Sequence, residues 1–396
     1  MTESSNTSAH LDLSDETSSD NGTSLEDASM VEPQEALRFS WQDLPRVSES
    51  LDGLNLPGTG GRIRSELDDF QVDELPLYEP QGSGSFLYVH VEKRGLTSSD
   101  LVKALKQAGV PEKRIGMAGL KDKYAIARQW LSIPNAQAEA LTALETLEGV
   151  RILETSRHKN KLGIGHLRGN HFQVRVRGVS TDAVDHARDV LDHLATYGLP
   201  NYFGPQRFGR FGNNAIDGFK VARRQEVPGG KRLARFFVAS LQSFVFNQLL
   251  AERIRAGLYD SVVTGDWAKK HYTGGTFLVE DGELESPRAK RLEISSALPL
   301  FGKKVRPSGG DAGVLEQAVL TRYDLRWTDG TMLRGDRRLS RVVLTETSVM
   351  PCEDGYIVAF TLPKGSFATS VLREVLDVAV DAPTERPRQS DTEDSA

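Results

Sequence analysis

The sequence of 396 residues predicts an α+β fold. Short runs of alternating apolar residues, which are typical of β-strands, are mixed with capped helical segments. These elements do not follow the regular strand–helix–strand order that a doubly wound parallel sheet requires. The chain is also long enough for two domains of ordinary size, each with its own core.

Four segments predict strands because β-branched and aromatic residues recur in them at about every second position. They are residues 70–75, 86–92, 172–178 and 356–362.

Three segments predict helices. Residues 97–109 begin with Thr and Ser caps and end at Gly109, and residues 180–198 are capped by Ser180 or Thr181 and end at Gly198. Residues 236–254 form the most apolar helical segment, which predicts a core helix.

Composition divides the chain into five parts. Residues 1–48 and 381–396 are polar, acidic and poor in aromatic residues, which predicts disordered tails. Residues 226–334 contain several Gly-rich turn signals and interrupt the preceding pattern, which predicts an inserted domain. Residues 49–225 and 335–380 would then be the two parts of one domain, which the family resemblance described below implies to be catalytic.

The net charge of −6 is unevenly distributed. Residues 1–50 and 381–396 together carry 16 acidic and 4 basic side chains, so residues 51–380 have a net charge of +6. A basic body between acidic ends favours binding to a polyanion such as RNA.

The single cysteine, Cys352, excludes an internal disulfide. No run approaches the eighteen or so apolar residues of a membrane-spanning helix, and the N-terminus lacks the pattern of a signal peptide. We therefore expect a soluble, cytoplasmic protein. A dinucleotide-binding loop, a Walker loop, a zinc site and a nucleophile elbow all lack sequence support.

Two stretches point to RNA. Residues 154–178 are rich in basic side chains, which suits a phosphate backbone, although a solvated basic hairpin has the same composition. In "NYFGPQRFGRFG" (201–212), aromatic residues and arginines alternate with glycines, which suits stacking on exposed bases. A structural hairpin is the alternative there. In "LPKGSFATSVLRE", a Pro and Gly turn presents Phe367 just before a helix that starts near Ala368 or Thr369, which also suits contact with RNA. A core phenylalanine beside an ordinary capped helix is the alternative.

The stretch "GMAGLKDKYAIARQW" (116–130) places Asp122 between Lys121 and Lys123. A solvated, charge-balanced turn would explain this pattern. A carboxylate held between two cations is also suited to nucleophilic or general-base catalysis next to RNA phosphates.

Six motifs in this order resemble the tRNA pseudouridine synthase D (TruD) family. They are "RIRSELDDFQVDELP", "GMAGLKDKYAIARQW", "RHKNKLGIGHLRGN", "NYFGPQRFG", "FVFNQLLAERI" and "LPKGSFATSVLRE". The resemblance covers about 57–378 and is weakest between about 226 and 340. It implies a pseudouridine synthase core with a mixed, largely antiparallel sheet and an inserted TRUD domain. It also implies isomerisation of uridine at position 13 in the D arm of transfer RNA, without metal or cofactor, by a monomer.

The resemblance implies roles for particular residues. Asp122 corresponds to the catalytic aspartate, and the substrate-binding residues are Phe70, Asn201, Phe203, Phe367 and Arg64, where many members have lysine. Candidates for contacts with the RNA backbone are Lys121, Lys123, Arg157, His158, Lys159, Lys161 and Arg207. The carboxylate would attack C1′ or C6, or remove the C2′ proton, and the sequence does not choose between these routes. A non-catalytic RNA-binding module or tRNA-folding chaperone is the alternative, and an adaptor acting through acidic tails is a third reading.

Overall fold

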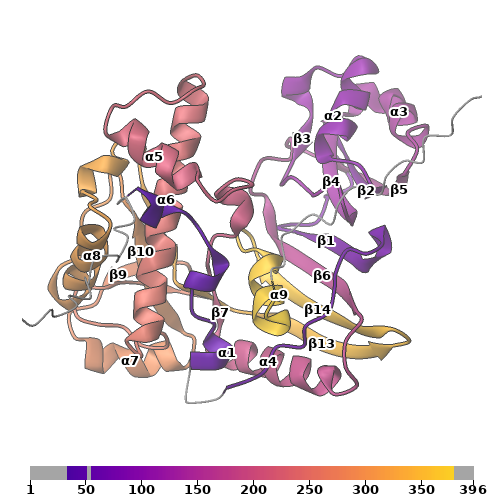
Figure 1. Cartoon of the computed structure of the whole chain (residues 1–396). Helices are drawn as coiled ribbons and strands as arrows, with labels where there is room; N and C mark the ends of the chain where they lie inside the picture. Colours follow the sequence, from indigo (N-terminus) through magenta and orange to yellow (C-terminus); the bar gives the residue numbers. More distant parts are fainter. Residues whose placement is uncertain (1–33, 51–54, 379–396) are drawn as a thin grey trace, which may run out of the picture.

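The structure is a computed structural model that describes residues 34–50 and 55–378. Two units lie side by side in it (Figure 1). One is built on a large sheet that runs from β13 to β5, and the other on the long helix α6 with a small sheet beside it.

The large sheet has the strand order β13-β14-β6-β1-β4-β2-β5, with β3 paired to β4. Only β1 and β4 are parallel, so the sheet is mixed and largely antiparallel, as expected. The four predicted strands correspond to β1, β2, β6 and β14. The strands are β1 (Phe70–Pro76), β2 (Phe86–Arg94), β3 (Gly116–Met117), β4 (Ile126–Pro134), β5 (Val150–His158), β6 (Leu167–Arg177), β13 (Thr345–Cys352) and β14 (Gly355–Pro363).

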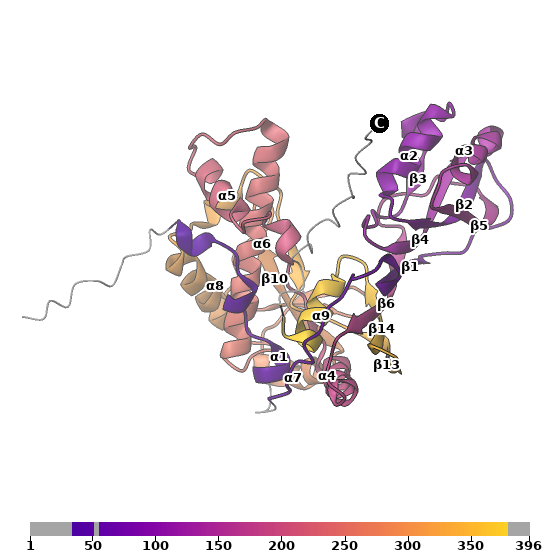
Figure 2. The same cartoon turned by 45° about the vertical axis from the view of Figure 1, so that its right-hand side comes forward.

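Alternation along the strands divides the sheet into two faces. Phe70, Val174 and Val358 lie in register across β1, β6 and β14 and are buried in the main core. That face packs on α4 (Ala183–Tyr197) and α9 (Ala368–Leu376). At the other end of the sheet, α2 (Ser98–Gln107) and α3 (Thr142–Glu145) enclose a second core with β2, β4 and β5. This end projects away from α9 in both views (Figures 1 and 2).

The second unit contains helices and a four-stranded sheet of order β11-β10-β8-β9. Because α5 packs on α6 and β11 pairs with β10, this unit extends slightly beyond the predicted segment 226–334 at both ends. Its elements are α5 (Asn214–Ala222), α6 (Lys231–Arg255), α7 (Gly282–Lys290), α8 (Gly310–Arg322), β8 (Trp267–Lys270), β9 (Thr276–Leu278), β10 (Ile294–Leu300) and β11 (Asp336–Leu339). The short pair β7 (Leu199–Pro200) and β12 (Arg341–Val342) lies where the chain enters and leaves it.

Helix α6 is the core helix that the sequence predicts. By length and apolar composition alone it would be able to cross a membrane, but 67% of its most apolar stretch is buried inside the protein. Phe246 and Leu250 are fully buried in the main core. This burial explains the apolar composition without a membrane.

The N-terminal part of the chain corrects one prediction. Residues 35–48 are not a tail, because Leu37, Phe39, Leu44 and Val47 are buried in the main core. The short helical turn Glu35–Leu37 contacts α5, and α1 (Val47–Ser50) contacts α4 and α6. The rest of the predicted N-terminal tail and all of 381–396 lie outside the described residues. At α4, the N-cap is Asp182 rather than Ser180 or Thr181.

Candidate active site

A cavity of about 590 Å³ lies between the two units. The large sheet, the loop before β4, the loop after β7, the start of α6 and the turn before α9 all contribute to its wall. Its lining includes Arg64, Phe70, Val72, Gly119, Leu120, Lys121, Asp122, Leu167, Asn170, Phe172, Gly204, Pro205, Gln206, Arg207, Phe236, Lys364, Gly365, Ser366, Phe367, Ala368 and Thr369. Motifs that are distant in the sequence therefore meet at one place.

Asp122 is the only acid among the described residues that line this cavity. It stands in the irregular loop between β3 and β4, and its side chain is 54% exposed. A carboxylate with this exposure is accessible to a ligand in the cavity. In the described part of the chain, no three His, Cys, Asp or Glu side chains are grouped so that they could hold a metal ion.

Arg64 is the cation closest to this carboxylate. Its Nη2 atom lies 3.5 Å from Oδ2 of Asp122, and its guanidinium carbon lies 4.3 Å from the centroid of the Phe70 ring. The backbone of Arg64 has a φ of 57°, in the left-handed region that non-glycine residues seldom adopt. Such an outlier persists only where the surrounding structure holds it.

Two lysines fix the loop around Asp122 from inside. The Nζ atom of Lys121 lies 2.5 Å from Oε2 of Glu74, and both side chains are buried. The Nζ atom of Lys93 donates to the backbone oxygens of Leu96 and Asp122, each at 2.6 Å. Because the ammonium of Lys121 is buried and paired with Glu74, the prediction that Lys121 contacts the RNA backbone is not supported. Lys93 was not among the predicted site residues.

The aromatic candidates occupy two layers. Phe70 and Phe367 line the cavity, as does Phe236 at the start of α6, which the sequence analysis did not single out. Phe203 lies behind Phe367, with 6.2 Å between their ring centroids, and is only 5% exposed. Phe70 lines the cavity but is only 3% exposed, so of the predicted aromatic residues Phe367, at 37%, is the one that is openly accessible from the cavity.

Asn201 is also behind the wall and is already engaged. Its amide nitrogen donates to the backbone oxygen of Leu339 at 2.9 Å, and its side-chain oxygen accepts a hydrogen bond from Arg338. The Arg338 guanidinium lies 4.2 Å from the Phe203 ring centroid and also donates to the backbone oxygen of Gly365 at 2.9 Å. Arg338 thus ties the predicted Asn201 and Phe203 to the turn before Phe367.

Arg338 has no carboxylate partner among the described residues. Burial, and to a smaller extent the neighbouring Arg207, lowers the pKa of Arg338 to about 9. Burial also lowers the pKa of Arg207, which lines the cavity and lies 5.4 Å from the Phe203 ring. Arg207, which lines the cavity and has no carboxylate partner among the described residues, is suited to bind an anion there, whereas the nitrogens of Arg338 are engaged with Asn201 and Gly365. The sequence does not indicate Arg338, because "GDRRLS" looks like an exposed charged strand.

The remaining basic candidates differ in accessibility. Lys123, Arg157, Lys159 and Lys161 are exposed, although Lys161 donates to the backbone oxygen of Lys113. His158, in contrast, is 6% exposed, and its ring stacks on Tyr78 at 5.1 Å between centroids. The prediction that His158 contacts the RNA backbone is therefore not supported, because its ring packs into the protein.

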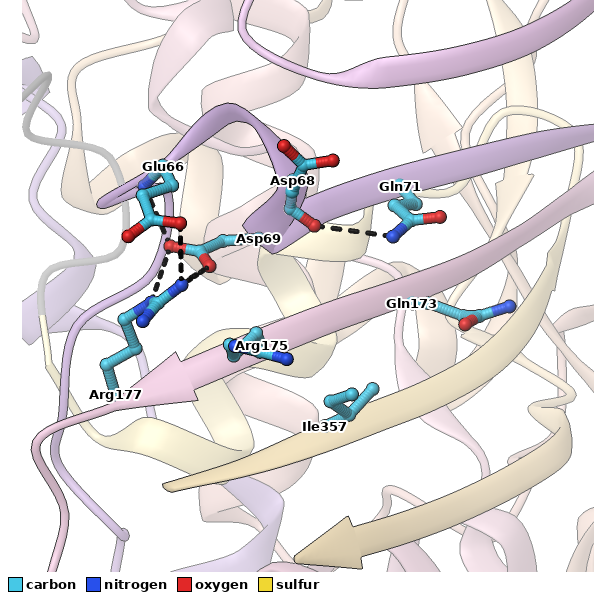
Figure 3. A pocket seen from close by; sticks show the side chains of 8 residues that line it. All are labelled: Glu66, Asp68, Asp69, Gln71, Gln173, Arg175, Arg177 and Ile357. Carbon is cyan, nitrogen blue, oxygen red and sulfur yellow. Dashed lines mark hydrogen bonds and ion pairs between the residues drawn. The ribbon is translucent and has the colours of Figure 1, made fainter. Parts of the chain in front are cut away.

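A second, smaller cavity of about 140 Å³ lies on the opposite face of the large sheet. Figure 3 shows Arg177 directed toward the carboxylates of Glu66 and Asp69, with Arg175 and Gln173 beside it on β6. The Nη2 atom of Arg177 lies 2.7 Å from Asp69 and 3.0 Å from Glu66. Its charge is neutralised by these acids, so this cavity is a structural contact between β6 and the segment before β1.

Comparisons with known proteins show the family of the chain. The sequence model of the family tRNA pseudouridine synthase D (TruD) matches residues 53–226 and 224–375. A tRNA pseudouridine synthase D from Thermus thermophilus is 50% identical over 342 residues, which are 86% of this chain and 95% of the relative. The enzyme of that name from Anaeromyxobacter dehalogenans is 44% identical over 344 residues, covering 84% and 96%.

The fold has also been seen in a crystal. A structure assigned to tRNA pseudouridine synthase D from Methanosarcina mazei superposes with a TM-score of 0.70 at 23% identity, covering 88% of this chain and 99% of the other. At that identity the likeness shows the fold alone.

The fold and the sequence relatives together define an RNA pseudouridine synthase, an enzyme of the isomerase class. The chain belongs to the tRNA pseudouridine synthase D family.

Proposed function

We propose that this enzyme isomerises uridine to pseudouridine in transfer RNA, at position 13 of the D arm, with Asp122 as the essential carboxylate. The observation that carries the proposal is that Asp122 is the only acid among the described residues lining a cavity with aromatic walls. The names of the relatives support transfer RNA as the substrate. The position in the D arm follows from the family resemblance.

The chemistry requires one well-placed carboxylate. The N1–C1′ bond of uridine must break, the uracil must turn, and a C5–C1′ bond must form while the proton on C5 leaves. Asp122 serves by adding to C1′ or C6, or by removing the C2′ proton. Arg64, 3.5 Å away, attracts and orients the carboxylate in either route.

The target base must leave its stack before it reaches Asp122. Phe367 lines the cavity, is 37% exposed and is the stacking surface for the flipped uracil, whereas Phe70 also lines the cavity but is only 3% exposed. Asn201 and Phe203 lie behind Phe367 and act as positioning residues through Arg338. Direct contact with the base is thus assigned to Phe367, and alignment to the buried residues.

The RNA backbone is held by cations in and around the cavity wall. Arg207 lines the cavity, and the exposed side chains of Lys123, Arg157, Lys159 and Lys161 extend the basic surface along the loop before β4, the end of β5 and the loop between β5 and β6. Counterion release from the phosphates would supply most of the affinity. We expect the enzyme to act in the cytoplasm as a monomer, which sedimentation with and without transfer RNA would test.

Release of tritium from C5-labelled uridine in transfer RNA tests the activity directly, because the isomerisation itself leaves the mass unchanged. The purified enzyme should release label from a transcript with uridine at position 13. A matched transcript with cytidine at that position should release none. Equal release from both would contradict the position, and no release from any transfer RNA would favour the RNA-binding or chaperone alternative.

A further inference from the structure

Leu120 is an exposed apolar side chain at the cavity. It is 74% exposed, it lines the cavity, and it is two residues before Asp122. Single exposed leucines are common on protein surfaces and need no explanation by themselves. What distinguishes Leu120 is its position beside the proposed catalytic carboxylate.

The backbone on both sides of Leu120 is fixed. The amide of Lys121 donates to Oγ of Ser98 at 2.9 Å, and its side chain is paired with buried Glu74. On the other side, the backbone oxygen of Ala118 accepts a hydrogen bond from the amide of Gly165 at 2.8 Å. An exposed apolar side chain on an anchored loop loses little conformational entropy when it inserts into a ligand.

The reaction requires a group that fills the gap left by the flipped base, and a rigid apolar side chain next to Asp122 is suited to this. Flipping a base out of a stacked RNA leaves a gap, and the cost of unstacking is a few kcal/mol. Nucleic-acid-binding proteins fill such gaps with side chains such as Leu, Ile, Met or Phe, which pack between the neighbouring bases. The basic residues of the cavity wall cannot do this without losing their contacts with phosphates.

We propose that Leu120 is the wedge that enters the RNA stack when the target uridine turns into the cavity. This inference rests on the proposed function and assigns a positioning role to a residue that does not touch the reacting atoms. Ile164 is the rival, because it is 77% exposed and its loop is tied to Ala118 through Gly165. Ile164, however, is not among the residues that line the cavity.

The test places 2-aminopurine beside the target uridine, because its fluorescence rises when it loses a stacking neighbour. With wild type, binding should raise the fluorescence and tritium should be released. Leu120→Ala should bind the same transfer RNA within threefold, give less than a third of the fluorescence rise and release label at least tenfold more slowly. Leu120→Met should restore both signals to within threefold of wild type, because it keeps the apolar bulk.

Two controls separate this role from general effects. Leu284→Ala, in α7 and outside the cavity, removes an equally exposed leucine (73%) and should behave as wild type. A synthetic RNA with abasic sites on both sides of the target has no stack to fill, so Leu120→Ala should act on it within threefold of wild type. Thermal melting of every variant should match wild type, since the altered side chains are exposed.

Several outcomes would overturn the inference. Wild-type fluorescence and turnover in Leu120→Ala would refute it, as would loss of both signals in Ile164→Ala but not in Leu120→Ala. Failure of the abasic RNA to rescue Leu120→Ala would also refute it. In these cases tritium release by wild type would leave the proposed function intact, whereas absence of release by wild type would overturn the function and the wedge together.

Discussion

The guanidinium of Arg64 joins Asp122 to Phe70: Nη2 lies 3.5 Å from the Asp122 carboxylate while the same group stacks 4.3 Å above the Phe70 ring. The partners come from segments more than fifty residues apart in the chain. A partly exposed ion pair of this length contributes little to stability, because water and salt screen it. The contact is therefore better explained by orientation of the carboxylate over the cavity than by folding.

Asp122→Asn should abolish the reaction and leave the fold unchanged. The amide has the size of the carboxylate but neither its nucleophilicity nor its basicity. We expect tritium release below detection, while the Kd for transfer RNA changes by less than about tenfold, or about 1.4 kcal/mol. Activity at a substantial fraction of wild type would show instead that Asp122 is a turn residue.

Replacing Arg64 separates charge from backbone strain. Arg64→Ala and Arg64→Gly both remove the guanidinium, and both should reduce turnover by at least tenfold. Only glycine also relieves the positive φ of 57°. The glycine variant should therefore be more stable than the alanine variant by about 1 kcal/mol in urea unfolding. Equal stability of the two variants would mean that the backbone relaxes at this position.

Lys93→Met should uncouple activity from stability. Methionine fills the same buried space without a charge, so the free energy of unfolding should not fall by more than about 1 kcal/mol. The backbone oxygen of Asp122, however, loses its donor at 2.6 Å, and turnover should fall at least tenfold with transfer RNA still bound. Unchanged turnover would show that the other contacts of the loop are sufficient.

The same variant predicts a change in pH dependence. Burial is the main cause that lowers the pKa of Lys93 to about 8 in the folded protein, from 10.5. Between these values the unfolded chain binds more protons, so wild-type stability should rise with pH from about 8 to 10.5, by an amount of the order of 2 kcal/mol. Urea unfolding of Lys93→Met over this range should lack that rise. A rise equal to that of wild type would place its origin in other groups.

Much of the fold could be predicted from local patterns. The strands β1, β2, β6 and β14 and the helices α2, α4, α6 and α9 were predicted to within a few residues, because apolar periodicity and caps are encoded locally. The boundary of the N-terminal tail was not predicted correctly. The segment 35–48 directly follows the acidic residues of the tail, and its four buried side chains become part of a core only by packing on distant elements, among them α4, α5 and α6.

The site was predictable where accessibility follows from residue type and not where it depends on a distant partner. Phe70, Asp122 and Phe367 do meet at one cavity. Lys121 and His158 look exposed in the sequence, but Glu74 and Tyr78 hold them inside the protein. Such partners come from other strands, and a single sequence does not reveal them.

Salt dependence tests the position of the RNA backbone. Lys159 is exposed on the loop between β5 and β6, and its ammonium has no ion-pair partner among the described residues, whereas Lys290, also exposed, lies at the end of α7. If Lys159 contacts a phosphate, Lys159→Gln should reduce the slope of log K against log salt by about 0.7 to 1, without changing which uridine is modified. Lys290→Gln should leave the slope at the wild-type value. Filter binding at several salt concentrations measures both slopes, and an equal reduction in the two variants would contradict a phosphate contact confined to the loop between β5 and β6.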